Sequence, residues 1–414
     1  MDLVISNARI PNYDSLMNVA IDKGKIVSVM PACCIDNLAA KEIIDAKKSL
    51  LLPGLIEPHI HLEKAYMLSL MKEDACSLWD AIRITAELKS QFTKEDIKER
   101  SIKVLKNAVL NGVSHLRCHV EVDPILQLKA MEVMLELKES FCHLIDLQIV
   151  VFPQEGIFTQ PGTAELMEEA LRMGGDIVGG IPYNDRDMEE HINYVFHLAE
   201  KYRKPVDFHA DFSDNPQDLS ILKIAEQTIR RGLQGQVAAG HVTSLGSVLY
   251  EHAVEVAKQI AKADLSIITL PATDLYLNGR GDQEKIRRGI APVQLLLEHG
   301  SNVIFGTNNI QNAFTPFGKG DPLDIAWLLA QTAYFGSKQD ADMLVEMTTT
   351  RAAKALNIQN YGIQEGAQAD LVLMEAASVR DCLINRPERK YVWKRGVKVA
   401  TTNMQQELFN MVKC

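Results

Sequence analysis

Residues 50–64 read LLLPGLIEPHIHLEK, and the prediction of the fold begins with them. The apolar run favours a buried strand that ends at the histidine pair His59 and His61. Successive side chains alternate between the two faces of a strand, so these two histidines point the same way. Neutral imidazoles that converge on one point are ligands for a divalent transition metal. We therefore expect a metal site at the C-terminal end of this strand.

Eight apolar segments of this kind alternate with helical patterns along the chain. Buried parallel strands read as continuous apolar runs, and their alternation with helices favours an α/β fold, the (β/α)8 TIM barrel. Active sites of this fold lie at the C-terminal ends of the strands, so polar residues there are the functional candidates. The expected strands cover residues 50–62, 112–122, 144–154, 176–183, 205–212, 236–244, 265–272 and 302–309.

The two ends of the chain have a different pattern. Both contain short segments, such as DLVISNARI (2–10) and RKYVWKRGVKVA (389–400), that are typical of strands joined by turns. We expect residues 1–50 and 361–414 to form one small β-sandwich domain. It would pack on a barrel domain of residues 51–360.

The composition is that of a soluble globular protein. The chain has 414 residues, of which 47% are hydrophobic, and a net charge of −10. No basic cluster stands out, so we expect neither nucleic acid nor an anionic membrane as a partner. The sequence also has no membrane-length apolar run and no signal-peptide pattern. The seven cysteines are scattered, which favours reduced thiols and a cytoplasmic location.

Longer motifs extend over nearly the whole chain. They are EPHIHLE (57–63), LRCHVEVD (116–123), IDLQIVVFPQEGI (145–157), LNGRGD (277–282), RRGIAPVQLLLEHG (287–300), NVIFG (302–306), FTPFGKGDPL (314–323) and NYGIQEGAQADLVLM (360–374). Together with the barrel histidines, they resemble the amidohydrolase superfamily and, within it, the cytosine deaminase family. This resemblance implies that the protein is a barrel hydrolase, that its substrate is a small molecule and that the protein forms homo-oligomers.

The resemblance also implies a metal site. His59 and His61 match the first two metal ligands of the family, and His209 matches the third. The fourth expected strand ends in GGIPY (179–183), without the lysine that bridges two metals in binuclear relatives. We therefore expect one divalent metal ion, zinc or iron.

Three further residues match substrate-side positions of the family. His241 matches the histidine that positions the attacking water or the substrate carbonyl. Gln154 matches the glutamine that hydrogen-bonds the amide edge of a pyrimidine. Asn278 lies in a loop that closes over the substrate in the family.

Two positions depart from the family pattern. Asn308 stands where the family has the metal-binding aspartate that acts as a base, and Phe212 replaces a glutamate that carries a proton to the ring. An amide oxygen can still contact a metal, but it is not a base near neutral pH. We place both side chains in the substrate pocket. Phe212 would fill the space of the glutamate carboxyl and make the pocket more apolar, which suits a substrate with an alkyl group there.

Another group must then transfer protons. Asp211 and Asp214 follow His209 closely, and we predict that one of them is the base. The remaining candidates are Asp274 and Glu63. The alternative is that these carboxylates only orient neighbouring groups around the metal ligands.

Three functions are compatible with these residues. The main hypothesis is deamination of a small cyclic amidine or aminoheterocycle, cytosine-like or creatinine-like, by attack of metal-bound water. The second is hydrolysis of an amide or N-alkyl bond on a triazine- or hydantoin-like ring. The third is a non-catalytic metal- or ligand-binding homologue, which the loss of two proton-transfer groups favours.

Overall fold

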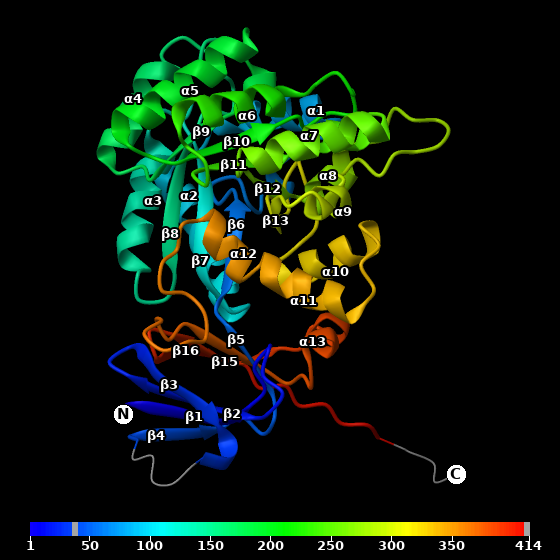
Figure 1. Ribbon diagram of the computed structural model, residues 1–414. Helices are drawn as coiled ribbons and strands as arrows, with labels where there is room; N and C mark the ends of the chain where they lie inside the picture. The colour runs from blue at the N-terminus through cyan, green and yellow to red at the C-terminus, as the bar shows by residue number, and fades with distance from the viewer. Residues whose placement is uncertain (35–39, 410–414) are drawn as a thin grey trace.

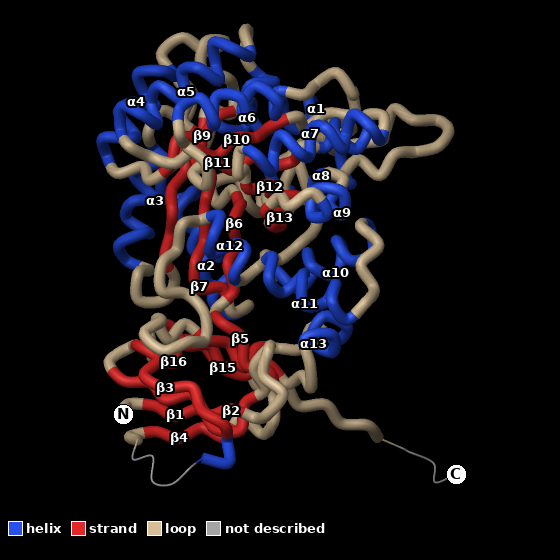
Figure 2. The backbone as a smooth tube through the Cα atoms, in the orientation of Figure 1, coloured by secondary structure: helices blue, strands red, loops and turns tan. Residues whose placement is uncertain are grey.

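The computed structural model describes residues 1–34 and 40–409, and its centre is an eight-stranded parallel sheet. The strands run in sequence order around a barrel, with helices on the outside (Figures 1 and 2). They are β6 (Leu55–Ile60), β7 (Val113–Glu121), β8 (Asp146–Phe152), β9 (Ile177–Gly180), β10 (Val206–Ala210), β11 (Val237–His241), β12 (Ser266–Thr269) and β13 (Asn302–Phe305). The predicted TIM barrel is confirmed.

Helices follow the strands and cover the barrel. The α-helices of the described residues are α1 (Leu78–Lys89), α2 (Lys94–Leu110), α3 (Lys129–Ser140), α4 (Thr163–Met173), α5 (Met188–Tyr202), α6 (Ser220–Arg231), α7 (Tyr250–Lys262), α8 (Pro271–Leu277), α9 (Val293–Glu298), α10 (Pro322–Thr332), α11 (Lys338–Met347), α12 (Thr350–Ala355) and α13 (Val379–Asn385). Short 3-10 turns are η1 (Ala32–Cys34), η2 (Leu68–Leu70), η3 (Pro182–Asn184) and η4 (Thr243–Ser247). Within the described part of the chain, no helix has the length and apolar character to cross a membrane.

The first and last strands meet through the backbone of Asn308. Its N–H donates to the carbonyl of His59 at 2.8 Å, and its own carbonyl accepts from the N–H of His61 at 2.9 Å. The Glu57 carboxylate holds Thr307, the residue before Asn308. It accepts from the Thr307 hydroxyl at 2.5 Å and from the Thr307 N–H at 3.0 Å. These bonds close the barrel at its C-terminal face.

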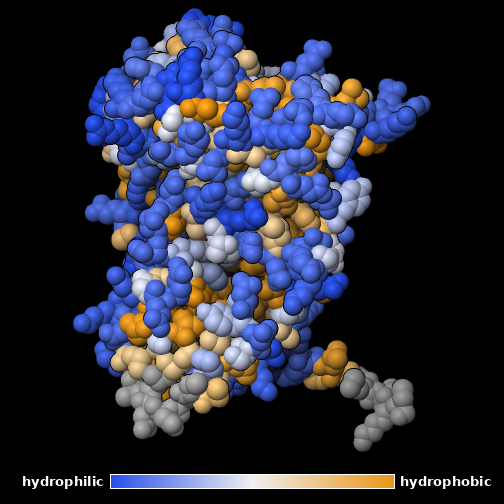
Figure 3. Space-filling model, in the orientation of Figure 1, coloured by the Kyte–Doolittle hydropathy of each residue, from blue (hydrophilic) through white to orange (hydrophobic). Residues whose placement is uncertain are grey.

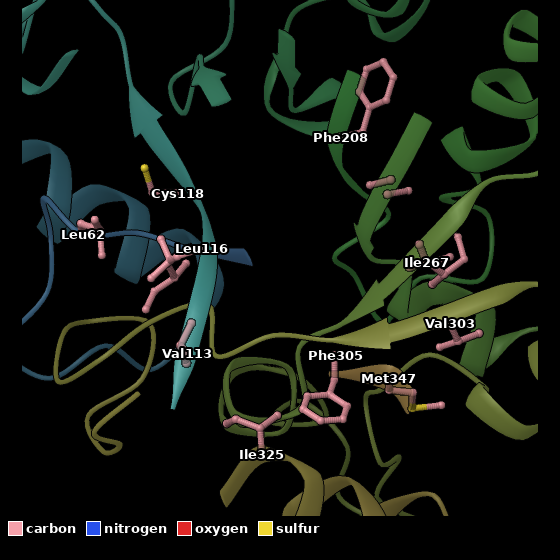
Figure 4. Close-up of a cluster of buried hydrophobic side chains, with 14 of the residues drawn as sticks. Leu62, Val113, Leu116, Cys118, Phe208, Ile267, Val303, Phe305, Ile325 and Met347 are labelled. Atoms are coloured by element: carbon pink, nitrogen blue, oxygen red, sulfur yellow. The ribbon is translucent and has the colours of Figure 1, made fainter. Parts of the chain in front are cut away.

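Apolar side chains fill the space between the strands and the helices. Figure 4 shows this core, in which Leu116 and Phe208 come from strands and Met347 comes from α11. All three are at most 1% exposed, and each such side chain contributes about 1.5–3 kcal/mol to folding. Hydrophilic residues cover most of the face seen in Figure 3, as expected when apolar side chains are buried in the core.

Two four-stranded sheets lie below the barrel, with strands from both ends of the chain (Figure 1). One sheet contains β1 (Leu3–Ala8), β2 (Met17–Asp22), β3 (Lys25–Pro31) and β4 (Glu42–Asp45). The other contains β5 (Leu50–Pro53), β14 (Leu371–Met374), β15 (Arg389–Lys394) and β16 (Val397–Thr401). They share a core that includes Ile5, Leu51 and Trp393, so the predicted small β domain is present. The exact division at residues 50 and 360 stays a prediction.

The predicted strand 50–62 is two strands instead of one. β5 pairs with β14 of the small domain, whereas β6 begins the barrel. Gly54 separates them and lies against Ser114, whose Oγ would be 2.5 Å from a Cβ at this position. A run of apolar residues shows burial but not the sheet to which each half belongs, which explains the error.

A buried ionic cluster joins the small domain to the bottom of the barrel. Lys394 Nζ lies 2.7 Å from carboxylate oxygens of both Asp146 and Asp370, and it donates to the Ser114 carbonyl at 3.0 Å. His115 lies beside this cluster. Burial lowers the pKa of His115 to about 4, and the charge of Lys394 acts in the same direction.

We expect His115 to make folding sensitive to acid. Its pKa is lower in the folded protein than in the unfolded chain, so stability is complete above pH 6.5 and falls as the pH drops toward 4. Between pH 7 and pH 5, this group lowers the free energy of unfolding by about 2 kcal/mol. Urea unfolding at pH 7 and pH 5 should show that the free energy of unfolding falls less for His115→Gln than for the wild type. The exposed His143→Gln variant is the control, and an equal loss in all three proteins would contradict the prediction.

Candidate active site

Three histidines converge at the C-terminal face of the barrel. His59 lies on β6, His61 directly follows that strand, and His209 lies on β10. The Nε2 atom of His209 is 3.2 Å from the Nε2 atoms of both other histidines. The three side chains are at most 3% exposed. The resemblance assigned these three residues as ligands, and the fold places His209 in contact with both of the others. The ring nitrogens that lie within 4.8 Å of one another are those of His59, His119 and His209.

These histidines fit a divalent metal ion. Burial, together with neighbouring positive groups, lowers the pKa of all three well below the usual value, so their nitrogens are neutral electron-pair donors. Asn308 lies on the same pocket, and its Oδ1 is buried without a hydrogen-bond partner among the described residues. Three imidazoles and a free amide oxygen form a donor set suited to zinc or iron.

A fourth imidazole lies beside the three. The ring of His119 is 3.8 Å from that of His59, and its Nε2 is 3.3 Å from Oδ1 of Asp207. Asp207 in turn accepts from Arg117 at 2.8 Å. The Nε2 of His119 and the Oδ1 of Asp207 are nevertheless buried without a hydrogen-bond partner among the described residues. A ring nitrogen of His119 also lies within 4.8 Å of ring nitrogens of His59 and His209, so His119 is a further candidate ligand.

His241 ends β11 and forms a pair with Asp274 of α8. Its Nδ1 lies 2.7 Å from Oδ1 of Asp274. Because a carboxylate accepts, Nδ1 carries the proton and Nε2 keeps its lone pair. Burial raises the pKa of Asp274, although the neighbouring His241 opposes this shift. Phe212 stacks on the imidazole at 4.0 Å with an angle of 7° between the rings.

A buried ionic network lies on the other side of the pocket. Lys64 Nζ donates to Glu121 at 2.7 Å and to Oε1 of Gln154 at 3.1 Å. Lys89 contacts the second oxygen of Glu121 at 2.5 Å, as well as Asp123 and Glu155. Burial disfavours ionisation of Glu121, but the two lysines outweigh it and lower its pKa to about 2.

Several of these residues line a small cavity with a free volume of about 10 Å³. It contains His61, Lys64, Leu78, Gln154, Tyr183, His209, Phe212, His241, Asn308, Asn309 and Phe314. A larger outer hollow of about 730 Å³ lies next to it. Leu78, Tyr183 and Phe212 line both spaces, so they separate the cavity from the hollow.

Three predicted site residues lie away from this cavity. The Asp211 carboxylate accepts from Ser220 N–H at 2.8 Å and from its hydroxyl at 2.5 Å, at the start of α6. Asp214 accepts from the N–H of Gly279 at 2.7 Å. Asn278 donates to the Gly289 carbonyl at 2.9 Å. All three predicted residues line the outer hollow, where they hold loops. The structure therefore does not support Asp211 or Asp214 as the base.

The other two carboxylate candidates differ from each other. Glu63 accepts from the N–H of Glu121 at 3.2 Å and is not among the residues of the cavity. Asp274 acts on the cavity through His241. That Asp211 or Asp214 is the base stays a prediction, and the structure shows both carboxylates bonded to groups of the outer loops.

Sequence reasoning missed Lys64 as a site residue. It lies three residues after His61 and is only 1% exposed. A lysine in a loop is usually exposed, and its burial depends on Glu121 from β7, which no local pattern shows. The one local signal that Lys64 is buried was its position in the stretch LEKAYM (62–67), where apolar and aromatic residues surround the charged pair.

Comparison with known proteins identifies the family of this chain. A model of the amidohydrolase family matches residues 88–400. The chain belongs to the amidohydrolase family. It is 30% identical to the N-isopropylammelide isopropyl amidohydrolase of Pseudomonas sp. (strain ADP), over 95% of this chain and 96% of that protein. It is 25% identical to a pterin deaminase of Rhizobium rhizogenes, over 96% of this chain and 93% of that protein.

The structure is also similar to a solved amidohydrolase. The 5-methylcytosine deaminase from Klebsiella pneumoniae, liganded with 5-fluorocytosine, superposes with a TM-score of 0.93 and 29% sequence identity. The match covers 98% of this chain and 99% of that chain. The protein is thus a hydrolase that acts on non-peptide C–N bonds, as the main hypothesis predicted. The alternative of a non-catalytic homologue gains no support from these relatives, which are all named as enzymes.

We expect His209→Ala to lose the metal and all activity, because it removes the nitrogen that lies next to both other ligands. His191→Ala is the matched control, since it removes an equally buried imidazole of α5 that lies 2.7 Å from Asp185 and is not among the residues of the cavity. Metal analysis of the purified proteins distinguishes the two variants. A full equivalent of metal in His209→Ala would contradict the ligand assignment.

Proposed function

We propose that the protein is a metal-dependent deaminase of a single-ring aminoheterocycle. The observation that carries the proposal is the convergence of His61, His209, His241 and Gln154 on one small cavity, with the imidazole of His59 in contact with that of His209. His59, His61 and His209 would hold one zinc or iron ion. When bound, this ion supplies a Lewis acid that makes water nucleophilic near neutral pH.

His241 is the proposed general base. Its Nε2 keeps a lone pair because Asp274 accepts the Nδ1 proton, so His241 can take a proton from the attacking water. Water oxygen forms the new bond to the ring carbon, and the same proton then passes from His241 to the departing amine. Ammonia leaves when the carbon–nitrogen bond breaks. This assignment gives a base to a site in which Asn308 and Phe212 have replaced two acidic residues.

The lining of the cavity favours a ring with an apolar substituent. The cavity has a free volume of about 10 Å³, which is room for about one water, so a ring enters it only when residues of the wall move apart. Leu78, Phe212 and Phe314 give it an apolar wall. A methylated pyrimidine amine suits this wall, and the similar enzyme from Klebsiella pneumoniae is named for 5-methylcytosine.

The second candidate is hydrolysis of an N-alkyl substituent, in which the ring carbon–nitrogen bond breaks and an alkylamine leaves. The most specific support is the 30% identity to an enzyme named for removal of an isopropylamine group from isopropylammelide. The same apolar wall would then contact the alkyl group of the leaving amine. The bond that breaks is still a ring C–N bond, so the leaving group distinguishes the two reactions.

A panel of ring amines tests the proposal. Metal-loaded protein should release ammonia from the single rings cytosine or 5-methylcytosine. Ammonia from a bicyclic pterin alone would contradict the restriction to one ring. Isopropylamine from isopropylammelide would favour the second candidate. Absence of any released amine across the whole panel would refute both.

We expect Asp274→Asn to lower kcat about 100-fold or more, because His241 then loses the carboxylate that fixes its proton on Nδ1. Asp214→Asn is the control, since this carboxylate holds a loop at the rim. Both variants should retain metal. An unchanged rate in Asp274→Asn, or an equal loss in Asp214→Asn, would show that the base lies elsewhere.

A further inference from the structure

His241 reaches the cavity although the register of its strand directs it elsewhere. In β11, Gly240 pairs with His209 of β10, and His241 pairs with Ala210. Residues in register on neighbouring strands face the same side of a sheet, and successive residues alternate between its sides. Gly240 therefore faces the barrel interior with His209, and a Cβ on it would lie 3.1 Å from Cε1 of His59. A regular strand would direct His241 outward with Ala210, which belongs to the apolar core.

The backbone of His241 reverses this direction. Its φ is 69°, in the left-handed region, whereas a parallel strand has a φ of about −120°. The two values differ by about half a turn around the N–Cα bond, so Cβ moves to the other side of the preceding peptide. The imidazole consequently lines the cavity, with its ring centre 5.2 Å from that of His209.

Val242 continues the left-handed turn, with a φ of 54° and a ψ of 37°. It is the only β-branched residue with a positive φ in the part of the chain that the structure describes. The left-handed region brings the Cβ of an L-residue close to a carbonyl oxygen, and a branched Cβ makes this conformation rarer still. Such strain persists only where the surroundings impose it, and it occurs most often at functional sites. The residue that this turn positions is His241.

The end of β10 holds the turn in place. The Ala210 carbonyl accepts from the N–H of Val242 at 2.9 Å. The Asp211 carbonyl accepts from the N–H groups of the two residues after Val242, at 3.0 Å and 3.1 Å. The Asp211 carboxylate meanwhile accepts from the N–H and the hydroxyl of Ser220 at the start of α6. Asp211 thus ties the turn to a helix of the barrel.

We propose that the left-handed turn at His241 and Val242 directs the base into the cavity, and that Asp211 is the positioning residue that holds this turn. The turn sets the direction of the Cα–Cβ bond of His241, and the 2.7 Å contact with Asp274 then fixes the rotation of the imidazole. Asp211 acts through its carbonyl group and its contact with α6, and it takes no proton. This role rests on the proposed function, because it concerns the direction of the proposed base.

Val242→Ala and Val242→Gly test the turn, because both remove the branched side chain and they differ only in Cβ. Glycine adopts a positive φ without strain, whereas alanine does not. Val242→Ala should lower kcat about 10-fold and retain metal and KM, because the turn loses its packing and keeps its strain. Val242→Gly should have a kcat about 3-fold or more above that of Val242→Ala, and a higher melting temperature.

Val237→Ala and Val237→Gly are the matched controls on the same strand. Val237 begins β11, is buried and has no positive φ. Glycine weakens an ordinary strand, so Val237→Gly should melt below Val237→Ala, and both should keep the kcat of the wild type. If Val242 had a packing role alone, its two variants would melt in this same order, and that result would overturn the proposal.

Asp211→Ala and Asp211→Asn give an independent test, which also serves if Val242→Ala does not fold. Asparagine tolerates the left-handed region and accepts from the start of a helix about as well as aspartate does. Asp211→Asn should therefore restore the kcat that Asp211→Ala loses, and the pH profile of kcat should keep its shape. An equal loss in both variants would make Asp211 a proton-transfer group and overturn its positioning role.

The melting temperatures are measured without turnover, so the turn and the proposed function can fail separately. If the wild type releases no ammonia, deamination is refuted, while a higher melting temperature of Val242→Gly than of Val242→Ala still supports the strained turn. If the wild type releases ammonia and both Val242 variants keep its kcat, the turn does not direct His241, and the proposal alone is refuted.

Discussion

The two hydrogen bonds between Asn308 and the backbone of His59 and His61 are the constraint on which the rest of this structure depends. A parallel barrel closes only when its last strand reaches its first, and here the meeting point is the histidine pair itself. Closure therefore fixes the metal-binding candidates and brings Asn308 Oδ1 to the cavity. The departure of Asn308 from the family pattern changes the side chain, while its backbone still closes the barrel.

Burial gives the cavity its chemistry. The same exclusion of water keeps the ligand imidazoles neutral and makes each unpaired charge costly. Lys64 and Lys89 are tolerated because Glu121 lies between them and pairs with both. Phe212 fills the space beside His241 by stacking on its ring. The pocket thus has an apolar wall with Phe212 and Phe314, and a charged wall with Lys64.

The barrel was predictable because its signal is local and repeated. Each buried strand is an apolar run, and each metal-binding candidate lies at the end of such a run, as His209 does on β10. EPHIHLE and the other motifs along the chain indicated the family, which the comparisons confirm. The prediction of Asp211 and Asp214 as bases has no support in the structure, because distance along the chain says little about where a carboxylate points once a strand has ended. The split of residues 50–62 between two sheets was missed for a similar reason, since both halves are equally apolar.

The sequence by itself determined the architecture, the family and the set of histidines available to a metal, because strand period and motif are properties of neighbouring residues. Only the tertiary structure decided that Asp274 supports His241 and that Lys64 donates to Gln154. The partners in these two contacts are 33 and 90 residues apart in the chain. Their contacts exist because the barrel brings the ends of its strands to one face, and hydrogen-bond direction there depends on which groups meet.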